Sequence, residues 1–534
     1  MRRPVAVFVL LTITLIVAAL SVGSVRLDSA TSDEPAYIAA GMIKLLHGRL
    51  DFFRDQPPLM NSITAVPLAI AGYRIAPGWR VGDNHWSVGK KFLYAEGHNW
   101  RRILFLARLP SIALFLVLCV AVYLFVAHHS GSRAAGVAAT LLTGFCPNLM
   151  AHGRLATVDI ALAFFSFAAA ALFLRLIEKP TVPVAIGAGV FAAAAALSKT
   201  SGNILAPFFA VVLLVVLLRR RAAKPGRIVM MAGVALLSAV AVLYAVVLGL
   251  GSDAYFAASF PGVPRLAVPF AEYAANLRAI SGWYTQGHDK PQFLLGEFST
   301  RGWPWYYPVA LFFKTTIPAL LIILFAAALA LRRRSLSFAA GMIGLFAVMF
   351  LAVAAKGELA LGIRYVLVIY PFVYAAAAIT LSTLRSRAAV AIVAALLGWH
   401  VLENLAAYPG YISYFNESIG DQRNADRFLI DSNLDWGQDL NRLNLWCREN
   451  GVREIAVHYF GGGAPQFELD AKVIGGYGAG GRPLPKGWFA LSRHLYRVSF
   501  SPSVSRESYD AYLARSHAQY VETVGGSIYV YRVP

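Results

Sequence analysis

Charged residues are scarce in this chain. They make up 14% of the 534 residues, whereas 58% of the residues are hydrophobic. Soluble domains carry roughly 25% charged residues, so this composition excludes an ordinary soluble protein. Cysteine is rarer still, and three cysteines exclude a disulfide-rich scaffold. Because Cys119 lies inside an apolar run, only Cys146 and Cys447 could pair, and we expect free, buried thiols.

Acidic residues are also few: 28 Asp and Glu stand against 48 Lys and Arg, which gives a formal net charge of +20. A basic stripe interleaved with aromatic residues is missing from the polar parts of the sequence, so we expect no nucleic-acid partner. The positive charge instead fits membrane topology and attraction to anionic lipids.

Long hydrophobic runs are what the chain has in abundance. Runs of about 16 to 25 residues can span a bilayer or nearly do so. The eleven runs found here lie near 4–22, 103–127, 134–149, 157–176, 182–198, 203–218, 228–250, 306–331, 336–355, 363–381 and 388–406. They predict an α-helical polytopic membrane protein with about eleven transmembrane helices. A convincing small-residue cleavage site does not follow the first run, so we interpret it as a retained anchor rather than a signal peptide.

The short loops with the densest Lys and Arg clusters alternate along the chain, which predicts a cytoplasmic N-terminus. An odd number of spans then places the C-terminus outside, together with two large loops, 23–101 and 251–303. We therefore predict a transmembrane module over 1–406 and an extracytoplasmic soluble α/β domain over 407–534.

Local patterns within the tail predict its elements. Residues 425–451 resemble a helix, with Asp431 or Ser432 as its cap and Gly451 as its stop. A second helix is expected over 505–516, and β-branched and aromatic residues predict strands over 454–460, 487–494 and 527–533. The glycines at 461–463 and 475–481 lack the strand–turn–helix context of a nucleotide loop, which favours flexible loops.

Two adjacent carboxylates, Asp33 and Glu34, follow the first span at its outer mouth, and Asp55 comes some twenty residues later. Charges at a membrane surface are costly unless they have a function. The predicted topology places further polar residues at the same face, namely Arg154, Asp159, Lys199, Lys356, Glu358 and Arg364. A carboxylate can accept a proton from an acceptor hydroxyl or amine. Arginine and lysine can neutralise a departing phosphate, so the set fits a lipid-linked phospho-sugar substrate.

Structural interpretations compete with this one. Asp33 could simply cap the helix expected over 34–47. Arg154 and Asp159 could form an ion pair, and Lys199 or Lys356 could extend from a membrane boundary toward water. The joint occurrence of these residues on one face favours the functional interpretation.

The same residues carry a family resemblance. The pattern DE-x2-Y at 33–37 followed by D-x-P-P-L at 55–59 resembles the protein O-mannosyltransferase family and the related lipid A aminoarabinose transferases. These are GT-C glycosyltransferases that use polyprenyl-phosphate sugars. Residues 151–165 resemble the family's second outer loop, and 294–315, 362–372, 408–420 and 431–440 resemble a bacterial branch.

The resemblance implies that Asp33 is the catalytic carboxylate, with Glu34 supporting it near the acceptor. It also implies that Arg154, Lys199 and Arg364 hold the donor phosphate, and that Asp159 orients Arg154 or lines the site. Asp55, Lys356 and Glu358 would line the site as well. Two departures leave the acceptor open: Gln56 stands where the mannosyltransferases usually carry His, and the tail is not a β-trefoil.

Some GT-C enzymes bind a divalent metal. A tight His/Asp/Glu cluster is not evident in this sequence, so we expect no obligatory metal, although a divalent metal is compatible with the resemblance. Asp431, Asp435 and Asp439 would lie along one helix face, where they could bind a cation or an acceptor sugar or form a solvated acidic face. Trp436 could stack on a sugar or pack in the core.

The sequence thus predicts a multi-pass enzyme of a bacterial cytoplasmic (inner) membrane. It would transfer a sugar from a polyprenyl-phosphate donor to an extracytoplasmic lipid, glycan or protein, with inversion. The alternatives are a transporter of lipid-linked glycans and a non-catalytic membrane assembly subunit. Transporters place charges at mid-membrane within repeated halves, and no internal repeat is evident here.

Overall fold

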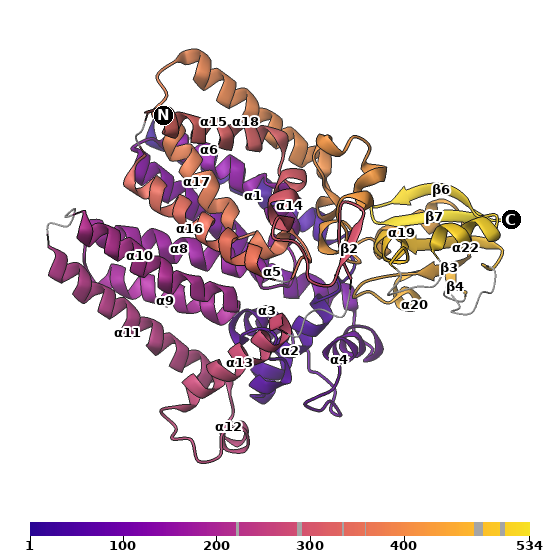
Figure 1. The fold of residues 1–534 in the computed structure, drawn as a ribbon. Helices are drawn as coiled ribbons and strands as arrows, with labels where there is room; N and C mark the ends of the chain where they lie inside the picture. The colour runs from indigo at the N-terminus through magenta and orange to yellow at the C-terminus, as the bar shows by residue number, and fades with distance from the viewer. Residues whose placement is uncertain (220–223, 286–290, 334–335, 358, 475–483, 502–507) are drawn as a thin grey trace.

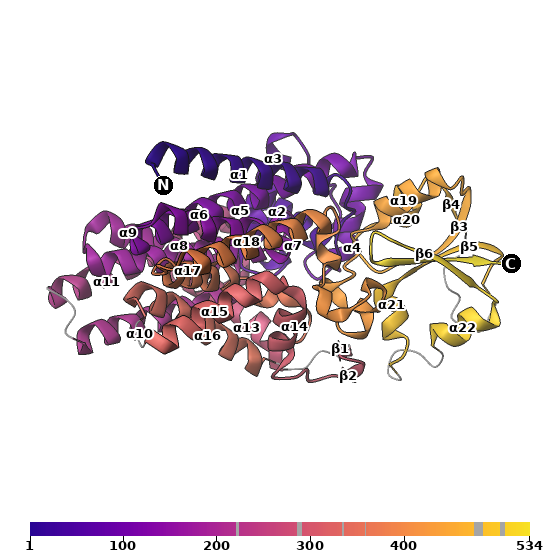
Figure 2. The ribbon, with the colours of Figure 1, turned by 90° about the horizontal axis from the view of Figure 1, so that it is seen from above.

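The computed structural model describes residues 1–219, 224–285, 291–333, 336–357, 359–474, 484–501 and 508–534 (Figure 1). A bundle of apolar helices forms one part, and a small mixed α/β domain formed by the C-terminal residues projects from one end of it. Figure 2 shows the same division from above, with α1 along one side of the bundle. The chain begins at the far end of the bundle and ends in the sheet domain.

Seven helices of the described chain are long and apolar enough to cross a membrane. They are α1 (Arg3–Val25), α5 (Trp100–Ser130), α8 (Asp159–Glu178), α10 (Leu205–Leu218) with the 3-10 turn η3 (Thr200–Ile204) before it, α11 (Pro225–Leu250), α16 (Phe338–Lys356) and α18 (Arg387–Ala407). A helix of twenty residues spans 30 Å, about the thickness of the hydrocarbon core.

Two further spans are bent pairs, which raises the number to nine in the part of the chain that is described. The pair α6 (Arg133–Gly144) and α7 (Pro147–Gly153) bends by 63°, and the pair α14 (Tyr306–Lys314) and α15 (Ile317–Arg333) bends by 117°. The two remaining predicted runs, 182–198 and 363–381, form the shorter apolar helices α9 (Val182–Ser198) and α17 (Ile369–Leu381), of 17 and 13 residues. All eleven runs contain helix, but within the described residues only nine of them qualify as spans by length and composition.

The first large loop is itself helical. It contains α2 (Glu34–His47), α3 (Pro58–Ile70) and α4 (His85–Lys90). The second large loop contributes α12 (Asp253–Ser259), α13 (Val268–Thr285) and the hairpin β1 (Gln292–Leu294) and β2 (Glu297–Ser299). Helix α2 packs on α3 and α4, and α13 packs on α11.

The C-terminal domain has one five-stranded sheet with strand order β4-β3-β5-β7-β6. Strand β3 pairs in parallel with β4 and β5, and β7 pairs antiparallel with β5 and β6. The strands are β3 (Glu454–His458), β4 (Lys472–Val473), β5 (Gly487–Ser492), β6 (Gln519–Val524) and β7 (Ile528–Val533). The helices are α19 (Leu440–Glu449), α20 (Pro465–Glu468), α21 (Arg493–Val498) and α22 (Tyr509–Arg515).

Alternating side chains along the strands bury both faces of this sheet. Val530 faces the cluster that contains α19, whereas Tyr529 and Tyr531 face the cluster that contains α22. Successive residues of a strand point to opposite faces, so the sheet is covered by a helix on each side. The three predicted strands are confirmed, and β6 was not predicted. The helix expected over 505–516 is confirmed as α22, Tyr509–Arg515, while 505–507 lie outside the described residues.

The helix predicted over 425–451 is wrong in its first half, because a regular helix begins only at Leu440. Asp431 and Gly437 have φ angles of +58° and +89°, which a right-handed helix cannot contain. Upstream side chains, among them Tyr411, Phe415 and Trp436, belong to the core of the helical bundle. The segment 411–436 thus connects the two parts of the molecule.

The expectation for cysteine is confirmed: Cys119, Cys146 and Cys447 are free and buried. The glycines at 475–481 lie outside the described residues. Gly461 and Gly462 instead occupy a tightly packed junction: a Cβ on Gly462 would overlap the Thr31 carbonyl oxygen and lie 2.8 Å from Pro35 Cδ. A residue larger than glycine does not fit there without displacing one part of the molecule from the other.

Candidate functional site

Asp33 occupies the N-cap position of α2, but its side chain makes no capping hydrogen bond. The carboxylate instead forms an ion pair with Arg364, with 3.1 Å between Oδ2 and Nη2. The Tyr37 hydroxyl lies 3.4 Å from the same oxygen and donates to it. Asp33 therefore does not act as a simple helix cap.

Arg364 joins Asp33 to a second carboxylate. Its Nη1 lies 3.8 Å from Asp159 Oδ2, and Lys199 Nζ donates to Asp159 Oδ1 over 2.6 Å. Asp33, Asp159, Lys199 and Arg364 form what we call the Asp33–Arg364 cluster. The indole of Trp436 covers the Arg364 guanidinium at 4.4 Å, which closes the cluster on the side of the C-terminal part.

The local fold explains why these residues meet. Asp159 is the first residue of α8, and Lys199 follows the last residue of α9, which packs on α8. The two residues therefore lie at the same end of an antiparallel helix pair. Arg364 lies in the 3-10 turn η4 (Ile363–Val366), directly after Gly362. Gly362 has a φ of +151° and abuts the Ser432 side chain, so a side chain there would displace the turn.

Burial leaves polar atoms of this cluster without hydrogen-bond partners. In the described part of the chain, Asp159 Oδ2 and Arg364 Nε of the cluster, and Nδ1 of the neighbouring His152, are buried and make no hydrogen bond. Burial also raises the pKa of Asp33; Arg364 lowers it, while the negative charges of Asp431 and Asp159 raise it further. Since buried polar groups are normally paired, the cluster can accept polar groups of a ligand.

Glu34 points away from Asp33. Its carboxylate receives two hydrogen bonds from Arg108, of 2.8 and 2.7 Å, and both side chains are fully buried. The backbone N–H groups of Thr31 and Ala156 donate to it as well. Burial raises the pKa of Glu34, but the Arg108 guanidinium outweighs this and holds the pKa below its ordinary value. Glu34 is therefore a buried carboxylate with a structural role, because Arg108 and two backbone N–H groups satisfy it.

Arg154 belongs to a second charged group. It forms an ion pair with Asp28 and lies over the Tyr411 ring at 5.5 Å. Arg442 bridges Asp28, at 2.6 Å, and Asp439. The structure does not bring Arg154 to Asp159, so neither the alternative ion pair nor the orienting role that the resemblance implied for Asp159 is formed.

The remaining candidates lie at the margin. Asp55 is half-buried, and burial and the negative charge of Asp33 raise its pKa while Lys44 lowers it. Lys356 is exposed at the end of α16, away from the cluster's contacts. Glu358 lies outside the described residues, so its place is not assigned.

An apolar groove of about 390 Å³ opens beside Lys199. The residues that flank Lys199 in sequence, Ala196, Leu197, Gly202 and Asn203, are part of its lining. The groove continues between α9, α10 and α11, where small and aliphatic side chains line it, and Tyr273 of α13 lies at its rim. The groove is thus an apolar trough between membrane helices, and two parts of its lining lie next to Lys199 in sequence.

The C-terminal part holds the segment 28–33 that precedes α2. Ser29 N donates to Gln438 O, Ser32 N to Trp436 O, and Gly462 N to Ala30 O, over 2.9, 2.8 and 3.2 Å. Two side chains from the membrane part, Ser29 Oγ and Tyr94 OH, donate to the buried Glu468 carboxylate over 2.5 and 2.6 Å. The loop that carries Asp33 is thus fixed from both sides.

Sequence reasoning missed several residues that build the site. Arg108 is an isolated arginine inside the apolar run 103–127, a signal that could have identified it. Asp28, Arg442 and the covering role of Trp436 have no such signal, because each depends on contacts between distant segments. For Trp436 the core-packing alternative is confirmed, since the side chain is 2% exposed.

The three aspartates of 431–439 do not share a helix face. Asp435 and Asp439 are buried, at 1% and 0% exposure, which excludes a solvated acidic face. Asp435 accepts hydrogen bonds from Ser492 Oγ and from the backbone N–H of His494. Asp431 lies close enough to Asp33 for its charge to affect the pKa of Asp33.

The chain and its structure are similar to known glycosyl-transferring proteins. Residues 103–245 match the sequence profile of the family described as dolichyl-phosphate-mannose-protein mannosyltransferase. None of the curated protein sequences matches the chain. Over 100% of this chain and 99% of the other, the structure resembles ArnT from Cupriavidus metallidurans bound to undecaprenyl phosphate, with a TM-score of 0.50 and 13% identity.

Two other solved structures are less similar. The Archaeoglobus fulgidus oligosaccharyltransferase AglB, in complex with an inhibitory peptide and a dolichol-phosphate, has a TM-score of 0.46 and 12% identity, over 98% of this chain and 74% of the other. The S. cerevisiae Pmt1-Pmt2 complex bound to the sugar donor has a TM-score of 0.34 and 15% identity, over 52% of this chain and 34% of the other.

The predicted fold class and family resemblance are confirmed. The chain has a GT-C fold with a C-terminal sheet domain, and its segment 103–245 is similar to the dolichyl-phosphate-mannose-protein mannosyltransferase family. The match covers α5 through most of α11, which includes Arg154, Asp159 and Lys199.

Proposed function

We propose that this protein transfers a sugar from a polyprenyl-phosphate donor to an extracytoplasmic acceptor, with inversion at the sugar carbon. The observation that carries the proposal is the Asp33–Arg364 cluster itself. It combines one carboxylate, Asp33, that no capping bond holds with two cations beside an apolar groove. A fold shared with ArnT supports it without determining the substrate.

In this proposal Asp33 is the general base or the group that orients the acceptor. A base must be unprotonated and within hydrogen-bond reach of the acceptor proton. The raised pKa of Asp33 makes it a stronger base than an ordinary aspartate. The acceptor oxygen or nitrogen attacks the sugar carbon while its proton passes to Asp33, and the carbon–oxygen bond to the phosphate breaks.

Arg364 and Lys199 then act on the leaving phosphate. Both cations are nearly buried, with side chains 8% and 6% exposed. Charge that develops on phosphate oxygens in a water-poor site is stabilised more strongly than in water. Arg364 Nε, which has no hydrogen-bond partner among the described residues, can donate to the phosphate without breaking an existing bond.

The apolar groove beside Lys199 is a candidate binding site for the prenyl tail of the donor. We propose that the prenyl tail lies between α9, α10 and α11 while the phosphate reaches Lys199. Apolar pockets with one charged end bind amphipathic ligands in this orientation.

We propose supporting roles for the remaining candidates. Glu34 fixes the Asp33 loop through Arg108, and Arg154 fixes the same loop through Asp28. Asp55 lines the acceptor side. The site then faces the extracytoplasmic side of a bacterial inner membrane, with the C-terminal domain 407–534 on that side and the membrane module 1–406 beneath it.

A divalent metal does not fit this cluster well. Arg364 and Lys199 already occupy the space next to the Asp33 and Asp159 carboxylates. The single group of three side chains that could hold a metal among the described residues, His128, His129 and Glu178, lies elsewhere. We therefore derive no step through a metal.

The test is transfer in proteoliposomes. Wild type, Asp33→Asn and the control Asp253→Asn, an exposed aspartate of α12, are supplied with radiolabelled polyprenyl-phosphate sugars and cell-envelope acceptors. The proposal predicts transfer by wild type and control, and its loss in Asp33→Asn with unchanged melting temperature. Transbilayer movement of the labelled lipid without transfer would instead identify a transporter. A lack of both activities would favour an assembly subunit.

A further inference from the structure

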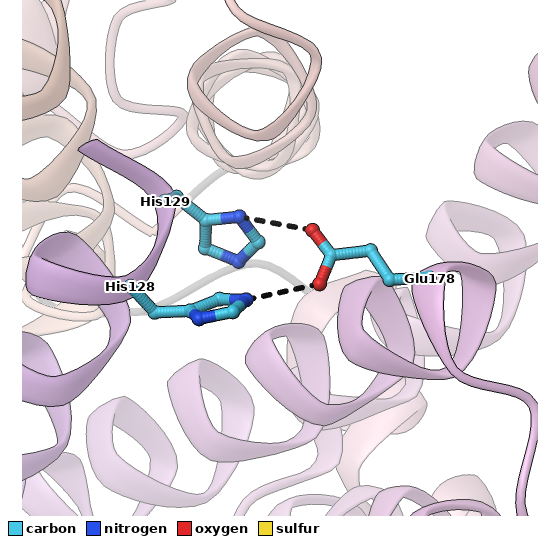
Figure 3. A group of neighbouring side chains, drawn as sticks. All are labelled: His128, His129 and Glu178. Atoms are coloured by element: carbon cyan, nitrogen blue, oxygen red, sulfur yellow. Dashed lines mark hydrogen bonds and ion pairs between the residues drawn. The ribbon is translucent and has the colours of Figure 1, made fainter. Parts of the chain in front are cut away.

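A second cluster of ligating side chains lies at the opposite end of α8 from Asp159. His128 and His129 end α5, and Glu178 ends α8 (Figure 3). A helix rises 1.5 Å per residue, so Glu178 lies about 28 Å along α8 from Asp159. The cluster is therefore independent of the proposed transfer site.

Both histidines converge on one carboxylate. His128 Nε2 lies 3.0 Å from Glu178 Oε2, and His129 Nδ1 lies 3.3 Å from Oε1. One ligand atom from each residue can be chosen so that all three lie within 4.8 Å of one another. Figure 3 shows the two rings directed at the two carboxylate oxygens. Neighbouring residues of a helix usually diverge, so their convergence depends on Glu178 from the second helix.

The packing holds the central ligand in place. The His129 side chain is 8% exposed, and its ring contacts that of Phe125 at 4.4 Å between centroids. Phe125 in turn meets Phe167 of α8 edge to face, with 5.4 Å between centroids. The ring of His129 is therefore fixed at the α5–α8 contact, whereas His128 and Glu178, about half exposed, can adjust.

We propose that His128, His129 and Glu178 bind one divalent transition metal of the zinc class, which joins the ends of α5 and α8. Imidazole and carboxylate donors are the ligands zinc takes besides thiolate, usually in tetrahedral geometry with Zn–N distances of about 2.0–2.1 Å. Because His128 and Glu178 are about half exposed, their side chains can rotate and bring their donor atoms closer to that of His129. A cavity of about 220 Å³ beside His129 and Glu178 leaves room for water as the fourth ligand.

Arg175 contacts two of the three proposed ligands, which leads to a prediction particular to this site. Its Nη1 lies 2.7 Å from His128 Nε2 and 2.9 Å from Glu178 Oε2. In the metal-free protein the guanidinium thus donates to two of the three ligands, and it must leave when a dication enters. Since the Arg175 side chain is 40% exposed, it can turn into solvent. Arg175 therefore competes with the metal, and its removal tightens binding.

The experiment uses the full chain in detergent, purified without a polyhistidine tag and titrated with Zn²⁺ alone. Calorimetry and thermal unfolding report binding without any assay of transfer. We expect one zinc per chain and a rise in melting temperature. His129→Ala and Glu178→Gln lower the affinity by at least about tenfold, since even groups that only support a ligand cost 10–100-fold. Arg175→Gln raises it.

His517→Asn is the matched control, because His517 is an exposed histidine of the C-terminal domain with a φ of +51° that asparagine tolerates. Its zinc affinity stays at the wild-type value. X-ray absorption of the zinc-loaded wild type shows two imidazoles in a coordination shell of nitrogen and oxygen.

Equal affinities in wild type, His129→Ala and Glu178→Gln would overturn the proposal, as would a zinc spectrum without imidazole. An unchanged or weakened affinity in Arg175→Gln would also overturn it, because an ordinary ion-pair network gains no metal affinity when a cation is removed. Metal-free melting temperatures check that each variant is folded.

Discussion

At the scale of single residues, the adjacent carboxylates Asp33 and Glu34 have opposite surroundings. Asp33 faces a site with unsatisfied polar atoms, whereas Glu34 is enclosed by Arg108 and two backbone donors. We therefore expect a substitution of Asp33 to have little effect on folding and a substitution of Glu34 to destabilise the protein. The sequence alone treats them as a pair.

Asp33→Asn is expected to lower kcat by about 10²–10⁴-fold, the usual contribution of a general base. Stability should hold or rise slightly, because burial already disfavours the charged form of Asp33. Transfer rates and melting temperature, measured together, check this. A variant that melts well below wild type would assign Asp33 a structural role.

Glu34→Gln, by contrast, is expected to lower the free energy of unfolding. Removal of one partner from a buried ion pair leaves the other charge uncompensated and costs about 3–5 kcal/mol. Thermal unfolding in detergent measures the loss. Exposed Glu449→Gln at the end of α19 serves as the control, with a change within about 0.5 kcal/mol. A stable Glu34→Gln protein would contradict the contact geometry.

Asp435 gives the folded protein a pH dependence. Burial raises its pKa from 3.8 to about 7, against the hydrogen bonds from Ser492, His494 and Gly437 that lower it. Between those two values the folded state binds more protons than the unfolded state, so its stability falls as the pH rises through this window. The slope from one group is at most about 1.4 kcal/mol per pH unit.

Asp435→Asn resembles the protonated carboxyl and should flatten this slope. Unfolding measured at several pH values between 5 and 8 compares the variant with wild type. Glu468 has a raised pKa as well and contributes in the same direction, so only the difference between the two proteins is diagnostic. Parallel pH profiles would show that Asp435 stays charged in the folded state.

At the scale of elements, the junction between the C-terminal part and the Asp33 loop sets the geometry of the site. Gly462→Ala places a methyl group against Thr31 and Pro35. We expect a fall of about tenfold or more in kcat, since a 1 Å misplacement can cost 10²-fold. Gly398→Ala in α18 is the control, because its Cβ meets nothing within 4 Å. Equal rates in both variants would mean that the loop is not held by this contact.

The elements also show how far sequence reasoning reaches. Apolar runs identified all nine candidate spans among the described residues, because length and composition alone determine them, but two further runs form helices too short to qualify. The helix expected over 425–451 was wrong because Asp431 and Gly437 adopt left-handed angles imposed by distant contacts, among them Gly437 against Gly461. Asp33, Asp159, Lys199 and Arg364 were predicted as candidates, but their pairing was not, since it depends on how four segments pack.

At the scale of the whole molecule, the C-terminal part, the Asp33–Arg364 cluster and the apolar groove follow one another. Trp436 covers the charged cluster, and Lys199 belongs to that cluster. The apolar groove begins at residues next to Lys199 in sequence and runs between α9, α10 and α11. A ligand that fits all of these has a polar head, a phosphate and a long apolar tail. Short soluble donors would use only the first part of this path.

This arrangement predicts how the length of the donor's prenyl tail affects KM. Ala196→Phe fills the groove next to Lys199. The variant should raise KM for long-chain polyprenyl-phosphate donors by about tenfold, because each buried methylene contributes about 0.8 kcal/mol and few need be displaced. A water-soluble donor with a very short prenyl chain should be used equally by both proteins, since it does not enter the groove.

Ala391→Phe on the exposed face of α18 separates a groove effect from a general effect of bulk in the membrane helices. It should leave KM unchanged for donors of every length. If Ala196→Phe affects short and long donors alike, the residue acts on the phosphate end through Lys199. If Ala196→Phe changes KM for neither the short nor the long donor, the prenyl tail does not bind in this groove. The tail would then extend from the cluster into the lipid rather than between α9, α10 and α11.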